Sequence, residues 1–226
     1  MDSLIVVINA LPAIAAGGVV TVGTVAVSLA LGFVLGTPLA VCQVYGCAAA
    51  RRLAEIYVWF FRGVPILVLL FLFYGLFIAL NLPAAPFLIC SVTLGMTSTA
   101  YQSQIYRGAI QSLPKGQLNA ARALGMGDKT AVACIILPQA LRLSIPGFAN
   151  EFSILLKDSA ICFVLGAQDI MARAGFVAAR THEHLALYAA AGLLYFALTH
   201  IVVKLLLRLE RHFRIPDYAV EGGGRS

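Results

Sequence analysis

Apolar residues dominate the chain in five long runs, and polar residues gather in the segments between them. A helix needs about 20 apolar residues to cross a bilayer. The runs predict an all-α membrane protein in which residues 1–226 form one transmembrane domain. The five expected spans are about 17–41, 64–80, 87–105, 144–165 and 185–207, with residues 4–13 as an interfacial lead-in to the first.

Basic residues between the runs predict the orientation of these spans. Positive residues accumulate on the cytoplasmic side of a membrane. The expected external loop 166–183 holds only Arg173 and Arg180, which places the amino terminus outside and the carboxyl terminus inside. The segments expected inside contain Arg51, Arg52, Arg62, Arg107, Lys115, Arg122, Lys129, Arg142, Arg208, Arg211, Arg214 and Arg225.

The longest polar interruption, about 107–142, predicts a cytoplasmic loop that contains a short helix. Residues 119–124 are rich in Ala, Leu and Arg, which favour helix. Gly125 and Gly127 can end this helix, because glycine adopts left-handed backbone angles without penalty. Pro138 fits the first turn of the helix that follows. We therefore expect a short helix that faces the aqueous phase between two membrane spans.

The fourth run carries charges at membrane depth. A charge there costs about 2.5–3.5 kcal/mol on insertion scales and indicates function by default. Glu151 and Asp158 are seven residues apart and share one stripe of a helix, about 10 Å apart along its axis. Asn150 and Lys157 share the neighbouring stripe. Two acids, an amide and a cation could bind a zwitterion; the alternative is an ion pair that only stabilises the bundle.

Polar residues also fill the inner half of the third run, between Thr97 and Gln104. Such groups should face protein or a water-filled path. Interhelical hydrogen bonding and pore lining are both open interpretations of this stretch.

Composition narrows the class. The chain has 226 residues, of which 61% are hydrophobic and 12% charged, whereas a soluble domain has about 25% charged residues. The net charge of +6 reflects membrane orientation and not nucleic-acid binding. Five scattered cysteines do not indicate a disulfide framework or a metal site. A phosphate-binding loop is missing, so we expect no cofactor and no enzymatic activity in this chain.

Three stretches resemble the permease subunits of ATP-binding cassette (ABC) importers. The motif Asn119-Ala120-Ala121, Gly125 and Pro138 resembles the EAA loop of that family. The stretches 61–65 and 150–159 resemble its polar amino acid branch. The family usually has glutamate where this chain has Gln104 and Asn119, so a salt bridge made by the acid of the EAA motif would be absent here. The likeness extends from about residue 17 to residue 211.

The resemblance implies a type I importer fold and a set of functional residues. ATPase coupling is expected at Asn119, Ala120, Ala121, Arg122, Leu124, Gly125 and Gly127. Positions Glu151, Lys157 and Asp158 match an intramembrane amino acid site of some members, and we add Asn150 to this site. The implied partners are ATPase subunits, an extracytoplasmic solute-binding protein and a second permease subunit, equal or different.

These inferences predict a multi-pass protein of the cell membrane that imports polar amino acids, with Glu151 favouring basic ones. Two alternatives stay open. One is a proton-coupled transporter that uses Glu151, Asp158 and His200 as a relay, although His200 fits better as a packed core residue. The other is a receptor or docking subunit that binds an ATPase without transport.

Overall fold

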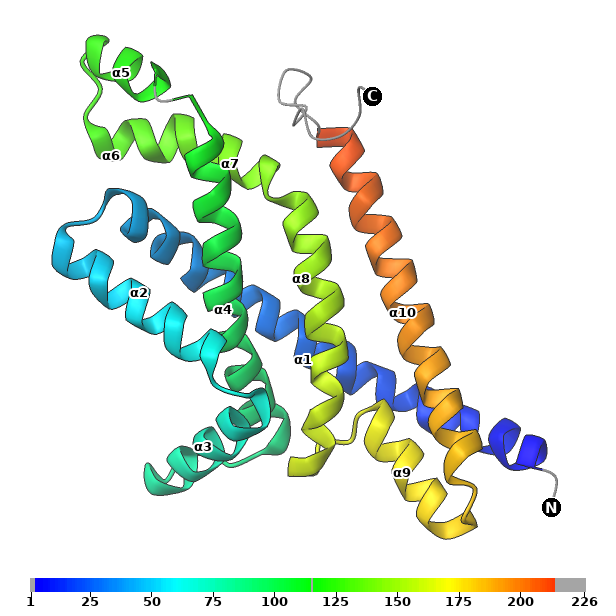
Figure 1. Ribbon diagram of the computed structural model, residues 1–226. Coiled ribbons are helices and arrows are strands. Elements are labelled where there is room, and N and C mark those ends of the chain that lie inside the picture. Colours follow the sequence, from blue (N-terminus) through cyan, green and yellow to red (C-terminus); the bar gives the residue numbers. More distant parts are fainter. Residues whose placement is uncertain (1–2, 115, 214–226) are drawn as a thin grey trace, which may run out of the picture.

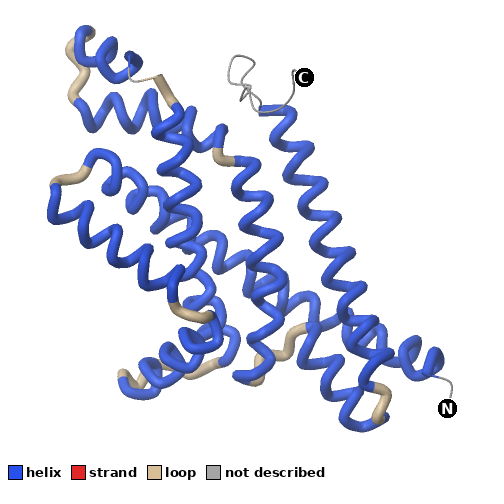
Figure 2. Tube along the Cα trace, viewed as in Figure 1, coloured by secondary structure: helices blue, strands red, loops and turns tan. Residues whose placement is uncertain are grey.

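The computed structural model describes residues 3–114 and 116–213, and for residues 209–213 the backbone alone. Helices joined by short turns make up this part of the chain, and it contains no strand (Figure 2). The all-helical fold class predicted from the apolar runs is confirmed.

Helix α1 (Ser3–Tyr45) has 43 residues, which corresponds to a length of about 64 Å. The expected interfacial lead-in is therefore a continuous part of α1. Its side chains Ala10 and Ile14 are buried against α9 (Ile170–Thr181) and α10 (His184–Phe213).

The second predicted span, 64–80, begins at a sharp bend between two helices. Helix α2 (Ala48–Gly63) and helix α3 (Ile66–Ala79) meet at an angle of 111°. Val64 and Pro65 have extended backbone angles between them, because proline lacks the N–H that would continue the helix. Helix α3 has 14 residues and reaches only about 21 Å, so this region can reach across a bilayer only together with α2.

Helix α4 (Pro86–Ser112) covers the third predicted span and continues into the expected loop as far as Ser112. It packs along α1, where glycines allow close approach (Figure 1). A Cβ added at Gly32 would lie 2.2 Å from Nε2 of Gln102, and one added at Gly36 would lie 3.1 Å from the carbonyl oxygen of Thr99. Small residues at a membrane helix contact have this role.

After α4 the chain forms α5 (Gly116–Ala123) and then a continuous helical rod of α6 (Asp128–Ala131), the π-helical turn η1 (Val132–Ile136) and α7 (Leu137–Leu143). Pro138 lies in the first turn of α7, as predicted, but the rod continues through it. The wider π turn stands directly before Pro138, where the α-helical hydrogen bond from residue 138 is impossible.

Helix α8 (Ile145–Asp158) and the 3₁₀ segment η2 (Ser159–Leu165) occupy the range predicted for the fourth span. The expected external loop 166–183 contains α9, a helix of 12 residues. Asp169 caps it, since its Oδ1 accepts a hydrogen bond of 2.7 Å from the amide of Ala172. Ile170, Ala174 and Ala178 form its buried face. Their spacing of four is the pattern in the sequence that could have indicated this helix.

Within the described residues, α1 and α10 are each long and apolar enough to cross a membrane. Two bent pairs qualify only jointly, α2 with α3 and the rod 128–143 with 145–165, which gives up to four spans by length and composition. Helix α4 is long enough, but its polar side chains reduce its apolar character. The count of five spans and the orientation stay predictions.

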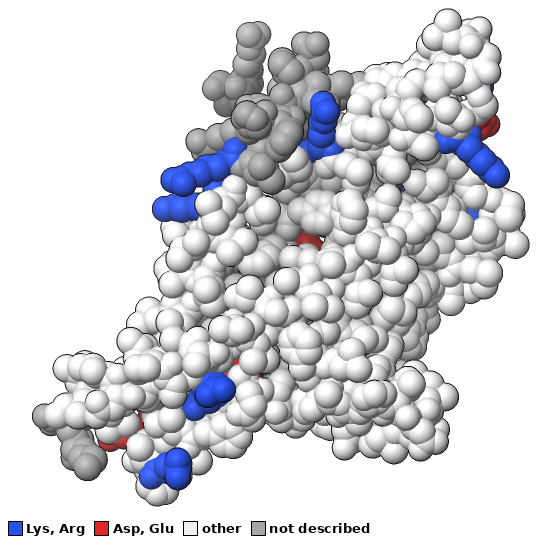
Figure 3. Space-filling view, turned by 180° about the vertical axis from the view of Figure 1, so that it is seen from behind, with Lys and Arg blue, Asp and Glu red and all other residues white. Residues whose placement is uncertain are grey.

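Figure 1 shows α5 and α6 at the end of the molecule where α10 finishes, whereas α3 and α9 lie at the opposite end. Figure 3 shows charged side chains near both ends of the visible face, with a band of uncharged residues between them and a small acidic patch in a hollow. A broad uncharged belt is what a bilayer requires.

Candidate functional site: a solvent-exposed connecting helix and a buried acid

Helix α5 ends in a Schellman motif, which fixes the direction in which the chain leaves it. The amide of Met126 donates to the carbonyl oxygen of Ala121 at 3.0 Å, and the amide of Gly125 donates to that of Arg122 at 2.9 Å. Gly125 has a φ of +79°, the left-handed conformation that the motif requires. Gly127 has an ordinary φ of −67° and precedes α6. Gly125 alone therefore ends the predicted helix.

The expected coupling residues form an exposed surface on α5 and the turn after it. Ala121 is buried. The side chain of Leu124 is 83% exposed although it is large and apolar. The other exposed members of the set are Asn119, Ala120, Arg122, Gly125 and Gly127.

An ion pair closes the turn between α5 and α6. Nε of Arg122 lies 2.7 Å from Oδ1 of Asp128, and Nη2 lies 3.0 Å from Oδ2. This two-bond contact with Arg122 lowers the pKa of Asp128 below its usual 3.8. The pair was not predicted from the sequence, where the two residues stand six apart around two glycines. It neutralises the charge of Arg122 within the chain.

A second contact holds the start of α5 to α7. The side-chain amides of Gln117 and Gln139 donate to each other, both at 3.0 Å. Nε2 of Gln139 also donates to the carbonyl oxygen of Ile135 at 2.7 Å. Helix α5 is thus connected to the rod near both of its ends.

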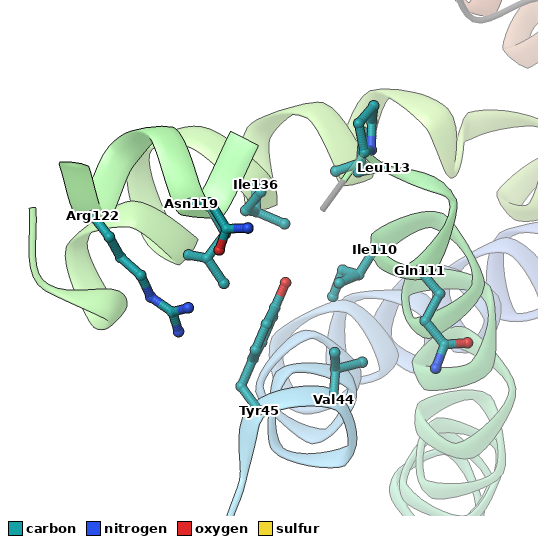
Figure 4. A pocket seen from close by; sticks show the side chains of 10 residues that line it. Val44, Tyr45, Ile110, Gln111, Leu113, Asn119, Arg122 and Ile136 are labelled. Carbon is teal, nitrogen blue, oxygen red and sulfur yellow. The ribbon is translucent and has the colours of Figure 1, made fainter. Parts of the chain in front are cut away.

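A cavity of about 580 Å³ separates α5 from the ends of α1 and α4 (Figure 4). Figure 4 shows Tyr45 directed into the space between Asn119 and Ile110. The lining residues are Val44, Tyr45, Ile110, Gln111, Leu113, Pro114, Leu118, Asn119, Arg122 and Ile136. Because α5 does not lie flush on the bundle, its position is set by the two contacts near its ends.

The structure separates the two polar stripes predicted on the fourth span. Asn150 and Lys157 are exposed, whereas Glu151 is buried and Asp158 is half-buried. Within the described residues, neither acid makes an ion pair within 4.0 Å. The four residues therefore face two environments in a single chain, the acids toward the bundle and the amide and amine toward its surroundings.

Glu151 ends a chain of buried hydrogen bonds. The hydroxyl of Tyr106 donates to Oε1 of Gln102 at 3.0 Å, and Nε2 of Gln102 donates to Oγ of Ser98 at 3.0 Å. Oγ of Ser98 donates to Oε1 of Glu151 at 2.8 Å. Each donor in the chain points toward the carboxylate, which accepts the last bond. The spacing of four between residues 98, 102 and 106 placed them on one face of α4.

Other polar side chains of α4 bond to its own backbone. Thr93, Thr97 and Thr99 each donate to the carbonyl oxygen four residues earlier. Such bonds satisfy buried hydroxyls without a partner helix. The inner half of the third span is therefore largely a buried, hydrogen-bonded face packed on α1.

His200 is exposed on α10 and stacks on Phe196 with ring centroids 5.8 Å apart. Its interpretation as a packed core residue is wrong, because α10 turns this side away from the bundle. No described contact joins His200 to Glu151 or Asp158, so the relay proposed for proton coupling is not assembled in this chain.

A helical bundle that presents a short exposed helix between two of its long apolar helices defines the class of protein: a multi-helix integral membrane protein. Residues 29–215 match the family of binding-protein-dependent transport system inner membrane components, and the chain belongs to that family. Its place in the membrane and its resemblance to ABC importer permeases are confirmed.

Curated relatives match over most of the chain. The arginine transport system permease protein ArtQ of Bacillus subtilis is 34% identical over 208 residues, which cover 92% of this chain and 95% of that protein. The histidine/lysine/arginine/ornithine transport system permease protein HisM of Salmonella typhimurium is 30% identical over 207 residues, which cover 87% and 88%.

Solved structures share the fold. A chain from the crystal structure of an amino acid ABC transporter with histidines superposes with a TM-score of 0.83 at 30% identity, and the match covers 94% of this chain and 99% of that one. A chain of the inward-facing MetNI methionine ABC transporter gives a TM-score of 0.79 at 21% identity, covering 89% and 97%, which supports the fold alone.

Proposed function

We propose that this chain is the translocating subunit of an ATP-driven importer of polar amino acids, and that basic amino acids are its preferred substrates. The exposed helix α5 carries this proposal. The Schellman motif at Gly125, the Arg122–Asp128 ion pair and the Gln117–Gln139 hydrogen bonds fix the position of α5, while its outer surface stays exposed. A rigid, exposed helix of this kind would allow a bound ATPase subunit to move the transmembrane helices.

Two ATPase subunits would bind the surface formed by residues 119–127, one on each of two permease chains. ATP binding would draw the two α5 helices together and favour the outward-open arrangement, and hydrolysis in the ATPase would reset it. Nucleotide then shifts the population of two states. A second permease chain, identical or related, is needed because one chain of this size does not enclose a path for substrate.

The membrane arrangement that fits this function has five spans, with α4 as the third. The α5 end faces the cytoplasm and α9 faces outside, where a solute-binding protein would deliver substrate. The uncharged belt between the charged ends in Figure 3 supports this arrangement.

Glu151, Asp158, Lys157 and Asn150 are the substrate residues in this proposal. An acid would receive the ammonium group and Lys157 the carboxylate, while the second acid would receive a basic side chain. The buried chain of donors that ends on Glu151 holds that carboxylate in one place. Relatives named for the transport of arginine and of histidine, lysine and ornithine support the preference for basic substrates.

The test compares Gly125→Ala with Gly127→Ala in proteoliposomes that contain the permease, its ATPase and its binding protein. Neither new Cβ would meet an atom within 4 Å, but only Gly125 has a positive φ. Alanine in that conformation costs about 1–2 kcal/mol and should displace the end of α5. We expect ATP-dependent uptake of radiolabelled arginine to fall in Gly125→Ala, to recover partly in Gly125→Asn, and to persist in Gly127→Ala.

Two results would contradict the proposal. Arginine uptake that is driven by a proton gradient without any ATPase would favour the secondary transporter. ATPase binding without uptake of any polar amino acid would favour the docking subunit.

A further inference from the structure

A second cavity, of about 450 Å³, lies among α1, α2 and α4. None of the proposed substrate residues of α8 lines this cavity. No residue of the surface 119–127 lines it either. The lining residues are Gln43, Glu55, Val58, Trp59, Arg62, Gly63, Gln104 and Arg107. Its volume is within the range of small-molecule sites.

Two arginines, Arg62 and Arg107, line this cavity. Arg62 lies over the ring of Tyr101 at 5.0 Å from its centroid, and this contact orients the side chain. Within the part of the chain whose side chains are described, neither Arg62 nor Arg107 forms an ion pair. The planar donor sets of both residues are therefore free to bind an anion.

A buried amide supplies a third donor. Gln43 is 5% exposed, and its Oε1 accepts a hydrogen bond of 2.9 Å from Nε2 of Gln104. Nε2 of Gln43 is also buried but has no hydrogen-bond partner among the described residues. Leaving a buried donor unpaired costs free energy, so a buried amide of this kind indicates a missing acceptor.

The acids near this cavity do not cancel its positive charge. Glu55 lines it but lies 3.9 Å from Arg52, which is outside the lining. Glu151 is within electrostatic reach of Arg62, but it belongs to α8 and does not line the cavity. The lining therefore contains two arginines and one acid, and keeps a net positive charge.

We propose that this cavity binds one carboxylate or phosphate anion, with Arg62 and Arg107 as its counter-charges and Nε2 of Gln43 as its hydrogen-bond donor. Free carboxylates such as that of an amino acid and the headgroup of an anionic phospholipid share this chemistry. The site does not depend on the proposed transport function, because its residues are distinct from those of α8 and α5.

The chain contains its own reporter, since Trp59 is its single tryptophan and lines the cavity. Purified permease in phosphatidylcholine nanodiscs would be titrated with sodium acetate, against sodium chloride at equal ionic strength, while the emission of Trp59 is followed. In a second series, phosphatidylglycerol would replace part of the phosphatidylcholine. We expect a saturable change of emission in at least one series.

Arg62→Gln removes a charged donor, and Gln104→Glu places a negative charge in the lining. Each should weaken binding by about tenfold or more, as expected for a hydrogen bond to a charged group. Gln43→Leu should weaken binding with no change of charge. Arg51→Gln is the matched control on the same helix and should titrate like the wild type, because Arg51 does not line the cavity and its described bond is to the carbonyl oxygen of Gly46, away from Glu55.

Saturation by acetate assigns the site to free carboxylates, and a response to phosphatidylglycerol alone assigns it to a lipid headgroup; both support an anion site. The proposal is overturned if neither series saturates, or if monodisperse Arg62→Gln and Gln104→Glu variants bind as well as the wild type.

Discussion

Two polar regions of this molecule lie in opposite environments. On α5 and the turn after it, polar and small residues are exposed, and local contacts such as the Arg122–Asp128 pair hold their shape. Between α1, α4 and α8, the polar residues from Tyr106 to Glu151 are buried and bonded to one another. A polar residue in the first region is available to a partner, whereas one in the second is part of the packing.

This difference predicts that substitutions in the two regions separate stability from function. A change that removes a hydrogen-bond partner from the buried set should lower the free energy of unfolding, because the group left unpaired cannot turn to water. A change of an exposed side chain on α5 should leave that free energy nearly constant and should lower uptake in the proposed importer. The contrast can be tested with single variants, beginning with the one expected to have the largest effect.

Gly32→Ala should destabilise the protein most. The new Cβ would lie 2.2 Å from Nε2 of Gln102, which also bonds Ser98 and the carbonyl oxygen of Leu29, so relief of the clash would break the buried chain. We expect a loss of about 1–3 kcal/mol in the free energy of unfolding, measured by denaturant titration in detergent micelles.

Gly192→Ala on α10 is the matched control, because its Cβ would meet no atom within 4 Å. Alanine favours helix over glycine by up to about 1 kcal/mol, so the control should be neutral or stabilising. Equal destabilisation by both variants would mean that the contact between α1 and α4 has no special importance.

Glu151→Gln should separate the structural role of Glu151, which accepts a hydrogen bond from Ser98, from its proposed role in substrate binding. The amide oxygen can still accept the bond from Ser98, so the free energy of unfolding should change little, whereas uptake of arginine should fall by about tenfold or more because the charge is lost. Glu151→Leu should also lose about 1–3 kcal/mol of stability, since the buried Ser98 hydroxyl loses its acceptor. Normal uptake in Glu151→Gln would limit Glu151 to packing.

The sequence predicted the fold class, the apolar ranges and the exposed helix well, because each depends on local composition or on a single residue such as Gly125. It did not predict the bend between α2 and α3, where an amphipathic helix and an apolar helix meet at Pro65. It also assigned Asn150, Glu151, Lys157 and Asp158, on two neighbouring stripes, to one site, although the fold buries Glu151, half-buries Asp158 and leaves the other two exposed. Which face of α8 is covered depends on a helix that is distant in the sequence, and periodicity carries no information about it.

Arg122→Gln should have the smallest effect, because the ion pair with Asp128 is exposed on both sides. We expect faster hydrogen exchange in residues 119–127, measured by mass spectrometry, and an unchanged free energy of unfolding. Arg122 lowers the pKa of Asp128, so this contact is complete above the usual carboxyl value of 3.8 and is lost as pH falls through the lowered value. Exchange in the wild type should therefore not change between about pH 5 and 8 once corrected for intrinsic rates. The charge-swapped double variant, Arg122→Asp with Asp128→Arg, should restore slow exchange if the pair itself holds the turn. If the swap exchanges as fast as Arg122→Gln, the Schellman turn at Gly125 holds α5 without help from the charges.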